Sequence, residues 1–326
     1  MTTPVRKVAL LGAGVIGAGW AARLIENGID VAIADPDPEV RRKTETVLAN
    51  AERALRRLFP DEPDRRGMVV FSESVEDAVD GADFVQESAP EREDLKRGLL
   101  ARAAAVAPAG VIVATSTSGL LPSVLQADCR FPERVVVGHP FNPVYLLPLV
   151  EVCGGKSTSA ETIEAASAFY ASIGMHPLVV RNEIDGFIAD RLLEALWREA
   201  LHLVNDGVAT TEEIDRAVCY GAGLRWAFMG TFGIYRLAGG EAGMRHFMAQ
   251  FGPALKLPWT KLEAPELTDE LIDRVSEQTE QQAAGRSVRE MERTRDDALV
   301  AILQALESQG IGAGIEVARW RETRSQ

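Results

Sequence analysis

The chain has 326 residues, of which 46% are hydrophobic and 25% charged, so it is long enough for two ordinary globular domains. Its formal net charge of −13 argues against nucleic acid or an anionic membrane as a partner, and no apolar run reaches the length that spans a bilayer. The first predicted strand leaves no room for a signal peptide and the three cysteines (Cys129, Cys153 and Cys219) are unclustered, so we expect a cytoplasmic protein with reduced thiols and no zinc site.

A glycine-rich turn lies between two predicted strands near the start of the chain. The apolar run 8–11 is followed by the motif G-x-G-x-x-G and a helical stretch expected from Trp20 to about Asn27, and a second apolar run, 31–34, ends on Asp35. In this context the motif binds a dinucleotide, because the glycines let the backbone approach a pyrophosphate at the positive end of a helix. Asp35 can bond both ribose hydroxyls and would repel a 2′-phosphate, which favours NAD over NADP. The predicted cofactor-binding residues of this unit are Gly12, Ala13, Gly14, Val15, Ile16, Gly17 and Asp35.

Strands and helices continue to alternate as far as Gly174. Further apolar runs predict strands at 69–71, 82–85, 111–114, 135–137 and 149–152, with helices between most of them. Such a pattern predicts an α/β fold of Rossmann type, with a doubly wound, mostly parallel sheet covered on both faces. Ligands of these sheets bind at the carboxyl ends of the strands, so we expect one crevice to be lined by Asp35, Glu87, residues 115–118 and Gly138–His139.

The character of the sequence changes near Asp185, after which it is helical. Helices are predicted over 186–205, 268–282 and 287–309, and Thr210 with Glu213 forms a capping box at the start of another. We therefore expect two domains, an NAD-binding domain over 1–184 and an all-helical domain over 185–326.

His139 directly follows an apolar strand, and a strand–loop–strand return can bring Glu151 beside it. A histidine near a loop is by itself more often structural, but the predicted NAD site and the nearby carboxylate favour a catalytic role. A carboxylate that holds one imidazole nitrogen leaves the other free to take the proton of an alcohol, while hydride leaves the same carbon for nicotinamide. The other histidines are expected in a turn (His176) and on helices (His202 and His246), without metal-ligand spacing.

The order of these motifs resembles that of the 3-hydroxyacyl-CoA dehydrogenase superfamily over nearly the whole chain. The motifs that carry the resemblance are the glycine-rich turn and the segments 115–118, 138–143, 150–152, 185–188 and 221–223. The resemblance implies NAD-linked oxidation of an L-3-hydroxy group and an all-helical C-terminal domain that dimerises. It also implies a catalytic dyad of His139 and Glu151. The remaining implied roles are a bond from Ser118 to the substrate oxygen beside the nicotinamide, and cofactor contacts from Ser118, Glu91, Lys96 and Asn142.

Two departures from the family pattern concern the substrate. Asp190 stands where the family has a catalytic-site asparagine, and an ionised aspartate cannot donate a hydrogen bond to a thioester carbonyl. The segment 224–228 is similar to that of a branch with small substrates, L-gulonate or L-carnitine, and Arg225 offers a planar fork for a free carboxylate.

Of these substrates the residues favour L-carnitine, whose trimethylammonium group binds the faces of aromatic rings. An aromatic box is predicted from Phe141, Trp197, Trp226 and Phe228, although aromatic residues at helical spacing are more often core residues. Trp197 shares a helix face with Asp190, which could add a negative charge near the ammonium group. A polyol such as L-gulonate would need hydrogen-bonding side chains instead. We therefore expect a homodimeric oxidoreductase that converts L-carnitine to 3-dehydrocarnitine. L-gulonate, a 3-hydroxyacyl-CoA and a non-enzymatic, crystallin-like NAD-binding protein remain alternatives.

Overall fold

The computed structural model describes residues 4–61, 65–263 and 265–324. The chain forms two compact units: unit 1 comprises Met1–Asp190, Arg295–Ser308 and Gly314–Gln326, and unit 2 comprises Arg191–Thr294 and Gln309–Ala313. The expected division into an NAD-binding domain over 1–184 and an all-helical domain over 185–326 stays a prediction. In the structure, the end of the chain belongs largely to unit 1.

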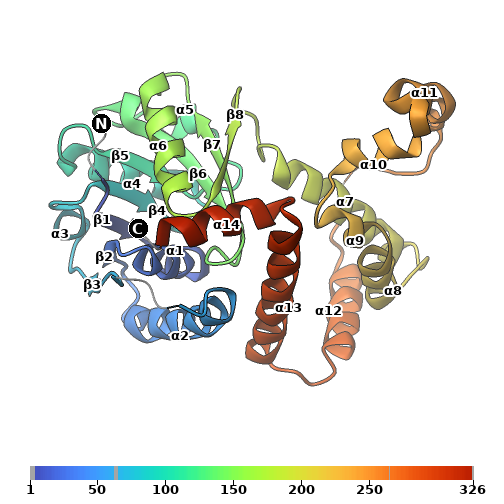
Figure 1. The fold of residues 1–326 in the computed structure, drawn as a ribbon, viewed down its shortest axis with the longest axis horizontal. Coiled ribbons are helices and arrows are strands. Elements are labelled where there is room, and N and C mark those ends of the chain that lie inside the picture. The colour runs from blue at the N-terminus through green and yellow to red at the C-terminus, as the bar shows by residue number, and fades with distance from the viewer. Residues whose placement is uncertain (1–3, 62–64, 264, 325–326) are drawn as a thin grey trace. The chain divides into compact units, whose positions relative to one another are not determined.

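Unit 1 contains one eight-stranded sheet with the order β3-β2-β1-β4-β5-β6-β7-β8 (Figure 1). All neighbouring strands pair in parallel except β6 and β7, which are antiparallel. The sheet is therefore the doubly wound, mostly parallel sheet that the sequence predicted. Its strands are β1 (Lys7–Leu11), β2 (Asp30–Ala34), β3 (Val69–Phe71), β4 (Phe84–Glu87), β5 (Ile112–Thr115), β6 (Val135–Pro140), β7 (Leu149–Gly154) and β8 (His176–Val180).

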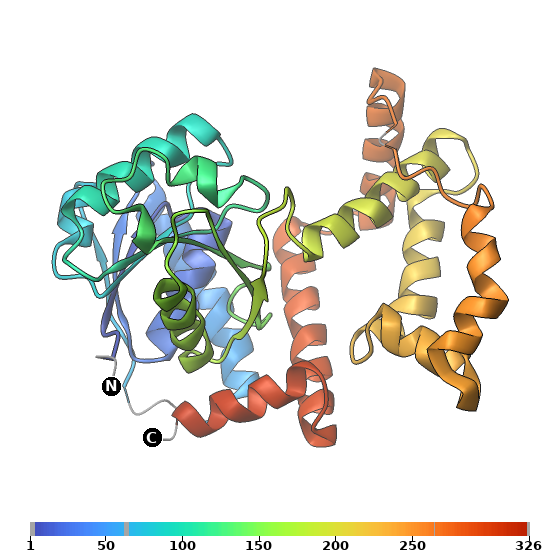
Figure 2. The same ribbon diagram turned by 90° about the horizontal axis from the view of Figure 1, so that it is seen from above.

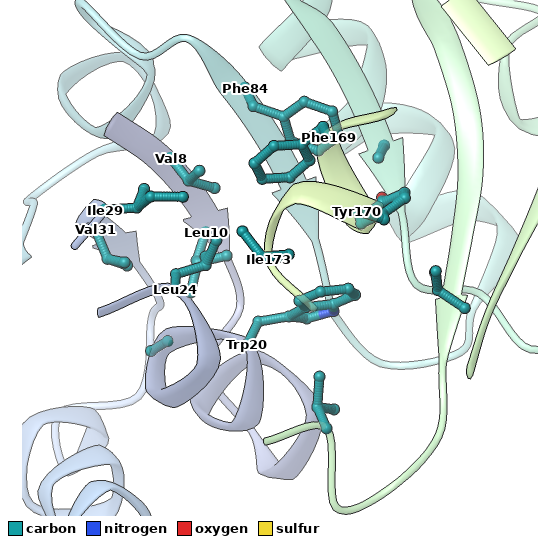
Figure 3. Packing of buried hydrophobic residues seen from close by; sticks show 14 of the residues in the cluster. Val8, Leu10, Trp20, Leu24, Ile29, Val31, Phe84, Phe169, Tyr170 and Ile173 are labelled. Carbon is teal, nitrogen blue, oxygen red and sulfur yellow. The ribbon is translucent and has the colours of Figure 1, made fainter. Parts of the chain in front are cut away.

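Helices cover both faces of this sheet, and alternate residues of β1 enter the two cores. Val8 and Leu10 pack with Trp20 and Tyr170 on one face (Figure 3), whereas Ala9 and Leu11 belong to the core on the other face. Fully buried, apolar strands of this kind are typical of a sheet with two covered faces. The helices of this part of the chain are α1 (Val15–Glu26), α2 (Val40–Leu58), α3 (Val75–Val79), α4 (Glu93–Val106), α5 (Pro122–Leu125) and α6 (Ala160–Ser172), with a 3-10 turn η1 (Pro132–Arg134).

Helix α1 and the segment around His176 differ from the predictions. Helix α1 begins at Val15 rather than Trp20, so the glycine motif runs into its first turn. His176 is the first residue of β8 and not part of a turn, and its N–H donates to the carbonyl of Pro148 at 2.8 Å. The strand β8 lies at the edge of the sheet, where the proline at 177 is tolerated.

The last two helices, α13 (Val288–Gln309) and α14 (Ala313–Arg324), return the chain to unit 1. Trp320 on α14 is buried and donates from Nε1 to Asn27 Oδ1 at 2.8 Å. The guanidinium of Arg23 lies 4.2 Å from the centre of its indole ring. On α13, the fully buried Asp296 accepts a hydrogen bond from Tyr145 at 2.6 Å. No helix was predicted over the residues of α14.

Unit 2 is helical in the residues that the structure describes (Figure 2). The predicted capping box is confirmed, because Thr210 and Glu213 bond each other's backbone N–H groups at the start of α8. Its elements are α7 (Ala189–Asn205), α8 (Thr211–Ala217), η2 (Val218–Ala222), α9 (Gly223–Trp226), α10 (Thr231–Ala238), η3 (Gly240–Ala242), α11 (Gly243–Phe251), η4 (Gly252–Lys256) and α12 (Asp269–Ala283), with the first residues of α7 belonging to unit 1 and those of α13 to unit 2.

None of the described helices has, taken singly, the length and apolar character to cross a bilayer, although α13 and α14 meet that test as a pair bent by 87°.

Candidate active site

The glycine-rich turn between β1 and α1 leaves no room for a side chain at Gly12 or Gly17. Gly12 has φ +94°, and a Cβ added there would lie 2.8 Å from the carbonyl oxygen of Ser88. A Cβ on Gly17 would lie 2.0 Å from the carbonyl oxygen of Gly12. Gly14 is the N-cap residue of α1, and a Cβ there would meet no atom within 4 Å. The turn is therefore closed towards the protein and open at the helix N-terminus, which fits a pyrophosphate on the N–H groups of α1.

Asp35 at the end of β2 is joined to this turn. Its Oδ2 accepts the N–H of Ala13 at 2.7 Å and its Oδ1 accepts the N–H of Asp37 at 2.8 Å. These bonds hold a half-buried carboxylate beside the glycines, which is the position where the ribose of a dinucleotide binds in this kind of fold. The residues present thus fit NAD.

His139 and Glu151 are direct partners across the two antiparallel strands. His139 on β6 is in register with Glu151 on β7, and its Nδ1 lies 3.1 Å from Glu151 Oε2. Both side chains are buried. Because a carboxylate accepts the proton on Nδ1, the second ring nitrogen, Nε2, keeps its lone pair and can take a proton from a substrate.

Glu151 also fixes the start of α7. Its Oε1 accepts the N–H groups of Ile188 and Ala189, each at 2.9 Å. The preceding residue, Phe187, is buried with φ +45°, a left-handed conformation that costs a bulky residue about 1–2 kcal/mol. Burial alone would raise the pKa of Glu151, but the hydrogen bonds from His139, Ala189 and Ile188 outweigh it and lower that pKa. Glu151 is therefore held as the carboxylate that its partner needs.

A buried polar network supports the strand that carries His139. Tyr170 donates to Gln86 Oε1 at 2.7 Å, and the amide of Gln86 donates to Ser116 Oγ at 2.8 Å and to the carbonyl of Gly138 at 3.3 Å. A Cβ on Gly138 would lie 1.9 Å from the hydroxyl of Tyr170, so only glycine fits before the histidine. The sequence interpretation did not single out this network, although a glutamine inside the apolar strand β4 was a signal for it.

A second network joins the predicted cofactor residues Lys96 and Glu91. The ammonium of Lys96 is almost completely buried and lies 3.0 Å from Glu87 Oε1 and 3.4 Å from Glu91 Oε2. Glu91 in turn accepts the N–H of Ser118 at 3.0 Å and the hydroxyl of Thr117. Burial raises the pKa of Glu87, against the opposing effect of the Lys96 charge. Glu91, held by Lys96, therefore anchors the loop on which Ser118 lies.

These networks surround a pocket of about 300 Å³ at the carboxyl ends of the strands. It brings together several of the predicted residues, among them His139, Ser118 and Ile16. Its lining residues are Ile16, Ser88, Ala89, Glu91, Lys96, Ser116, Ser118, His139 and Pro140. The size and the mixed lining suit a nicotinamide ring with a small substrate. Within the described part of the chain, no group of three or more His, Cys, Asp or Glu side chains is placed to hold a metal ion.

The other predicted site residues lie in different places. Asp190 Oδ2 is 3.8 Å from His139 Nε2, and the ring of Phe141 is centred 4.7 Å from that of His139. Asn142 is exposed on the loop after β6. The predicted substrate residues Trp197, Arg225, Trp226 and Phe228 belong to unit 2, and their roles stay predictions.

Comparison with known families identifies both halves of the chain. The model of the 3-hydroxyacyl-CoA dehydrogenase NAD binding domain matches residues 7–184, and that of the 3-hydroxyacyl-CoA dehydrogenase C-terminal domain matches residues 186–284.

Similar proteins include two bacterial enzymes and a solved structure. The L-carnitine dehydrogenase of Pseudomonas aeruginosa is 60% identical over 306 residues, which cover 93% of this chain and 95% of that protein. The L-carnitine dehydrogenase of Mesorhizobium japonicum is 57% identical over 312 residues, or 95% of this chain and 86% of that protein. The crystal structure of 5-formyl-3-hydroxy-2-methylpyridine 4-carboxylic acid 5-dehydrogenase, an NAD+-dependent dismutase, matches with a TM-score of 0.78 and 29% identity over 93% of this chain and 99% of that one.

Proposed function

Because the chain belongs to the 3-hydroxyacyl-CoA dehydrogenase family and is an NAD-dependent hydroxy acid dehydrogenase, we propose that it oxidises the 3-hydroxyl of L-carnitine to 3-dehydrocarnitine with His139 as the general base. The observation that carries the role of His139 is its Nδ1 contact with the buried Glu151, which leaves Nε2 as the proton acceptor. The substrate is supported by relatives of 57–60% identity that are named for L-carnitine.

The residues of unit 1 divide the work of the reaction. Ser118 holds the substrate oxygen in the pocket, and Nε2 of His139 takes the hydroxyl proton. Glu151 fixes the tautomer of the ring and stabilises the positive charge that it gains. NAD, held by the turn 12–17 and by Asp35, supplies the acceptor for the hydride.

The two charged ends of L-carnitine, its carboxylate and its trimethylammonium group, are assigned to residues of unit 2 and to Phe141. Arg225 is proposed to bind the free carboxylate, since a guanidinium binds a carboxylate with two parallel hydrogen bonds. Trp197, Trp226, Phe228 and Phe141 are proposed as the aromatic residues that bind the trimethylammonium group. Trp197, Trp226 and Phe228 are each 44–52% exposed in the structure, so their ring faces are accessible to a ligand.

A comparison of substrates tests this function. NADH formation, followed at a fixed enzyme concentration, is expected to be fast with L-carnitine and at least about 100-fold slower, as kcat/KM, with L-gulonate and 3-hydroxybutyryl-CoA. The expectation follows because L-gulonate lacks the cation and the thioester lacks the free carboxylate. No turnover of L-carnitine would reject the proposal, and faster turnover of one of the other two would identify the substrate instead.

We further propose that the enzyme is a homodimer joined through unit 2. Large apolar side chains are widely exposed on this unit, including Tyr220 at 78%, Phe232 at 81% and Leu255 at 86%. Exposed apolar surface of this extent marks an interface, and the family resemblance indicates a second copy of the chain as the partner.

Replacing Phe232 by glutamate is expected to shift the protein from twice the monomer mass towards the monomer, because a charge at an apolar interface is costly to bury. Light scattering after size exclusion measures this shift. The matched control is Met68→Glu, at a methionine of unit 1 that is 66% exposed, which should leave the mass unchanged. A wild-type protein that is monomeric at micromolar concentration would contradict the proposal.

The two halves of the chain are proposed to have different functions. Residues 1–184 bind the cofactor, and residues 185–326 bind the substrate and dimerise. A cytoplasmic location is proposed because Cys129, Cys153 and Cys219 are all free thiols, and a reducing compartment keeps thiols in this state.

A further inference from the structure

Asp190 places a carboxyl group near the nitrogen of His139 that is proposed to take the proton. It is the second residue of α7, and its Oδ2 lies 3.8 Å from Nε2 of His139. Its side chain is 26% exposed, so a ligand can reach it. Both groups are positioned by the same residue, because Glu151 binds the ring of His139 with one oxygen and the N–H of Ala189 with the other. The distance between Asp190 and His139 is therefore fixed by Glu151.

At 3.8 Å this contact is too long for a hydrogen bond to the imidazole. Asp190 does not hold the ring, which Glu151 already does. The space beside Nε2 is left for the hydroxyl oxygen of a substrate. A substituent on the carbon that bears this hydroxyl then lies close to the carboxylate of Asp190.

The two arms of L-carnitine differ in the sign of their charge. From the carbinol carbon, one methylene leads to the carboxylate and one methylene leads to the trimethylammonium nitrogen. A hydroxyl bound at Nε2 brings the charged end of one arm within a few bond lengths of Asp190. A carboxylate at this place attracts the ammonium arm and repels the carboxylate arm, and in a partly enclosed site the effect is large.

We infer that Asp190 is a specificity-determining residue that selects a substrate with a cationic group one methylene from the reacting carbon, and that it thereby sets which arm of the substrate lies beside Asp190. This inference rests on the proposed function. Exchanging the two arms at a fixed hydroxyl and C–H bond converts one enantiomer into the other. Fixing the ammonium arm at Asp190 therefore also decides which enantiomer directs its C–H bond to the cofactor.

The test uses the variant Asp190→Asn, which keeps the size of the side chain and removes its charge. The substrates are L-carnitine, D-carnitine and racemic 3-hydroxy-5,5-dimethylhexanoate, in which a neutral tert-butyl group replaces the trimethylammonium group. The variant is expected to lose about 10- to 100-fold in kcat/KM for L-carnitine and to change less than about 3-fold for the neutral isostere. The ratio of L- to D-carnitine turnover is expected to be lower in this variant than in the wild type.

Two further variants separate charge from structure. Asp190→Glu keeps the charge and is expected to retain a preference for L-carnitine over the isostere. Glu161→Gln removes an exposed carboxylate of unit 1 and should leave both substrates unchanged. A loss that is equal for L-carnitine and the isostere would overturn the inference, because a merely structural role predicts that result. Unchanged turnover of L-carnitine by Asp190→Asn would also overturn it.

The wild-type enzyme distinguishes this failure from failure of the proposed function. If the wild type does not oxidise L-carnitine, the proposed function falls and the inference with it. If the wild type oxidises L-carnitine and Asp190→Asn does so equally well, only the inference falls.

Discussion

Replacing His139 by alanine is expected to lower kcat by about 10²- to 10⁴-fold, the range that a general base contributes. The imidazole is the group that receives the hydroxyl proton, and the carboxylate at 3.1 Å from its Nδ1 cannot reach the substrate in its place. The glycine turn and Asp35 do not depend on this side chain, so the variant is expected to bind NAD as the wild type does. Steady-state kinetics with L-carnitine and a titration with NAD measure the two quantities.

A second histidine of unit 1 offers a matched control. His176 Nδ1 lies 3.1 Å from Glu316 Oε1, the same separation as in the pair His139–Glu151, but its side chain is 57% exposed at the edge strand. His176→Ala should therefore keep kcat within about 2-fold, as is usual for an exposed site away from the chemistry. Appreciable turnover by His139→Ala would remove His139 from the mechanism.

Replacing Gly17 by alanine is expected to abolish NAD binding at millimolar cofactor and to destabilise the protein by about 1–3 kcal/mol. The added Cβ would lie 2.0 Å from the carbonyl oxygen of Gly12, which is backbone and cannot rotate away. Either the turn opens or α1 moves from β1, and both changes displace the N–H groups that hold the pyrophosphate. Calorimetric titration with NAD and chemical unfolding measure the two effects.

Gly98 in α4 is the control for this substitution. A Cβ there meets no atom within 4 Å, so Gly98→Ala is expected to leave NAD binding unchanged and to stabilise the helix by about 0.5–1 kcal/mol. A Gly17→Ala protein that binds NAD with wild-type affinity would show that the turn does not hold the cofactor.

The sequence predicted those features of unit 1 that depend on local patterns. The order strand, glycine turn, helix, strand and Asp35 lies within one short segment, and the family and its NAD cofactor agree with that prediction. The adjacency of His139 and Glu151 needed only a short return between two strands. Their direct pairing could not be predicted, because the register depends on how the loop between β6 and β7 closes.

Elements held by distant contacts were missed. The strand β8 contains Pro177, although proline is normally absent from strands because it has no N–H to donate. The position of β8 at the edge of the sheet permits this proline. Helix α14 follows two glycines with positive φ, Gly310 and Gly312, and it is held by Trp320 against residues nearly three hundred positions earlier. The network of Gln86 and Tyr170 joins residues 84 positions apart, so no local pattern reveals it.

The return of the last two helices, α13 and α14, to unit 1 limits where the protein can be truncated. A fragment that stops after residue 184 would keep the glycine turn, His139 and Glu151, yet it would lose Trp320 and Asp296. Asn27 and Tyr145 would lose their partners on these helices, and the face of α1 that α14 covers would meet water. The cofactor half is thus not a detachable module, and a shortened version, a fusion partner or a domain exchange must carry the C-terminal helices along.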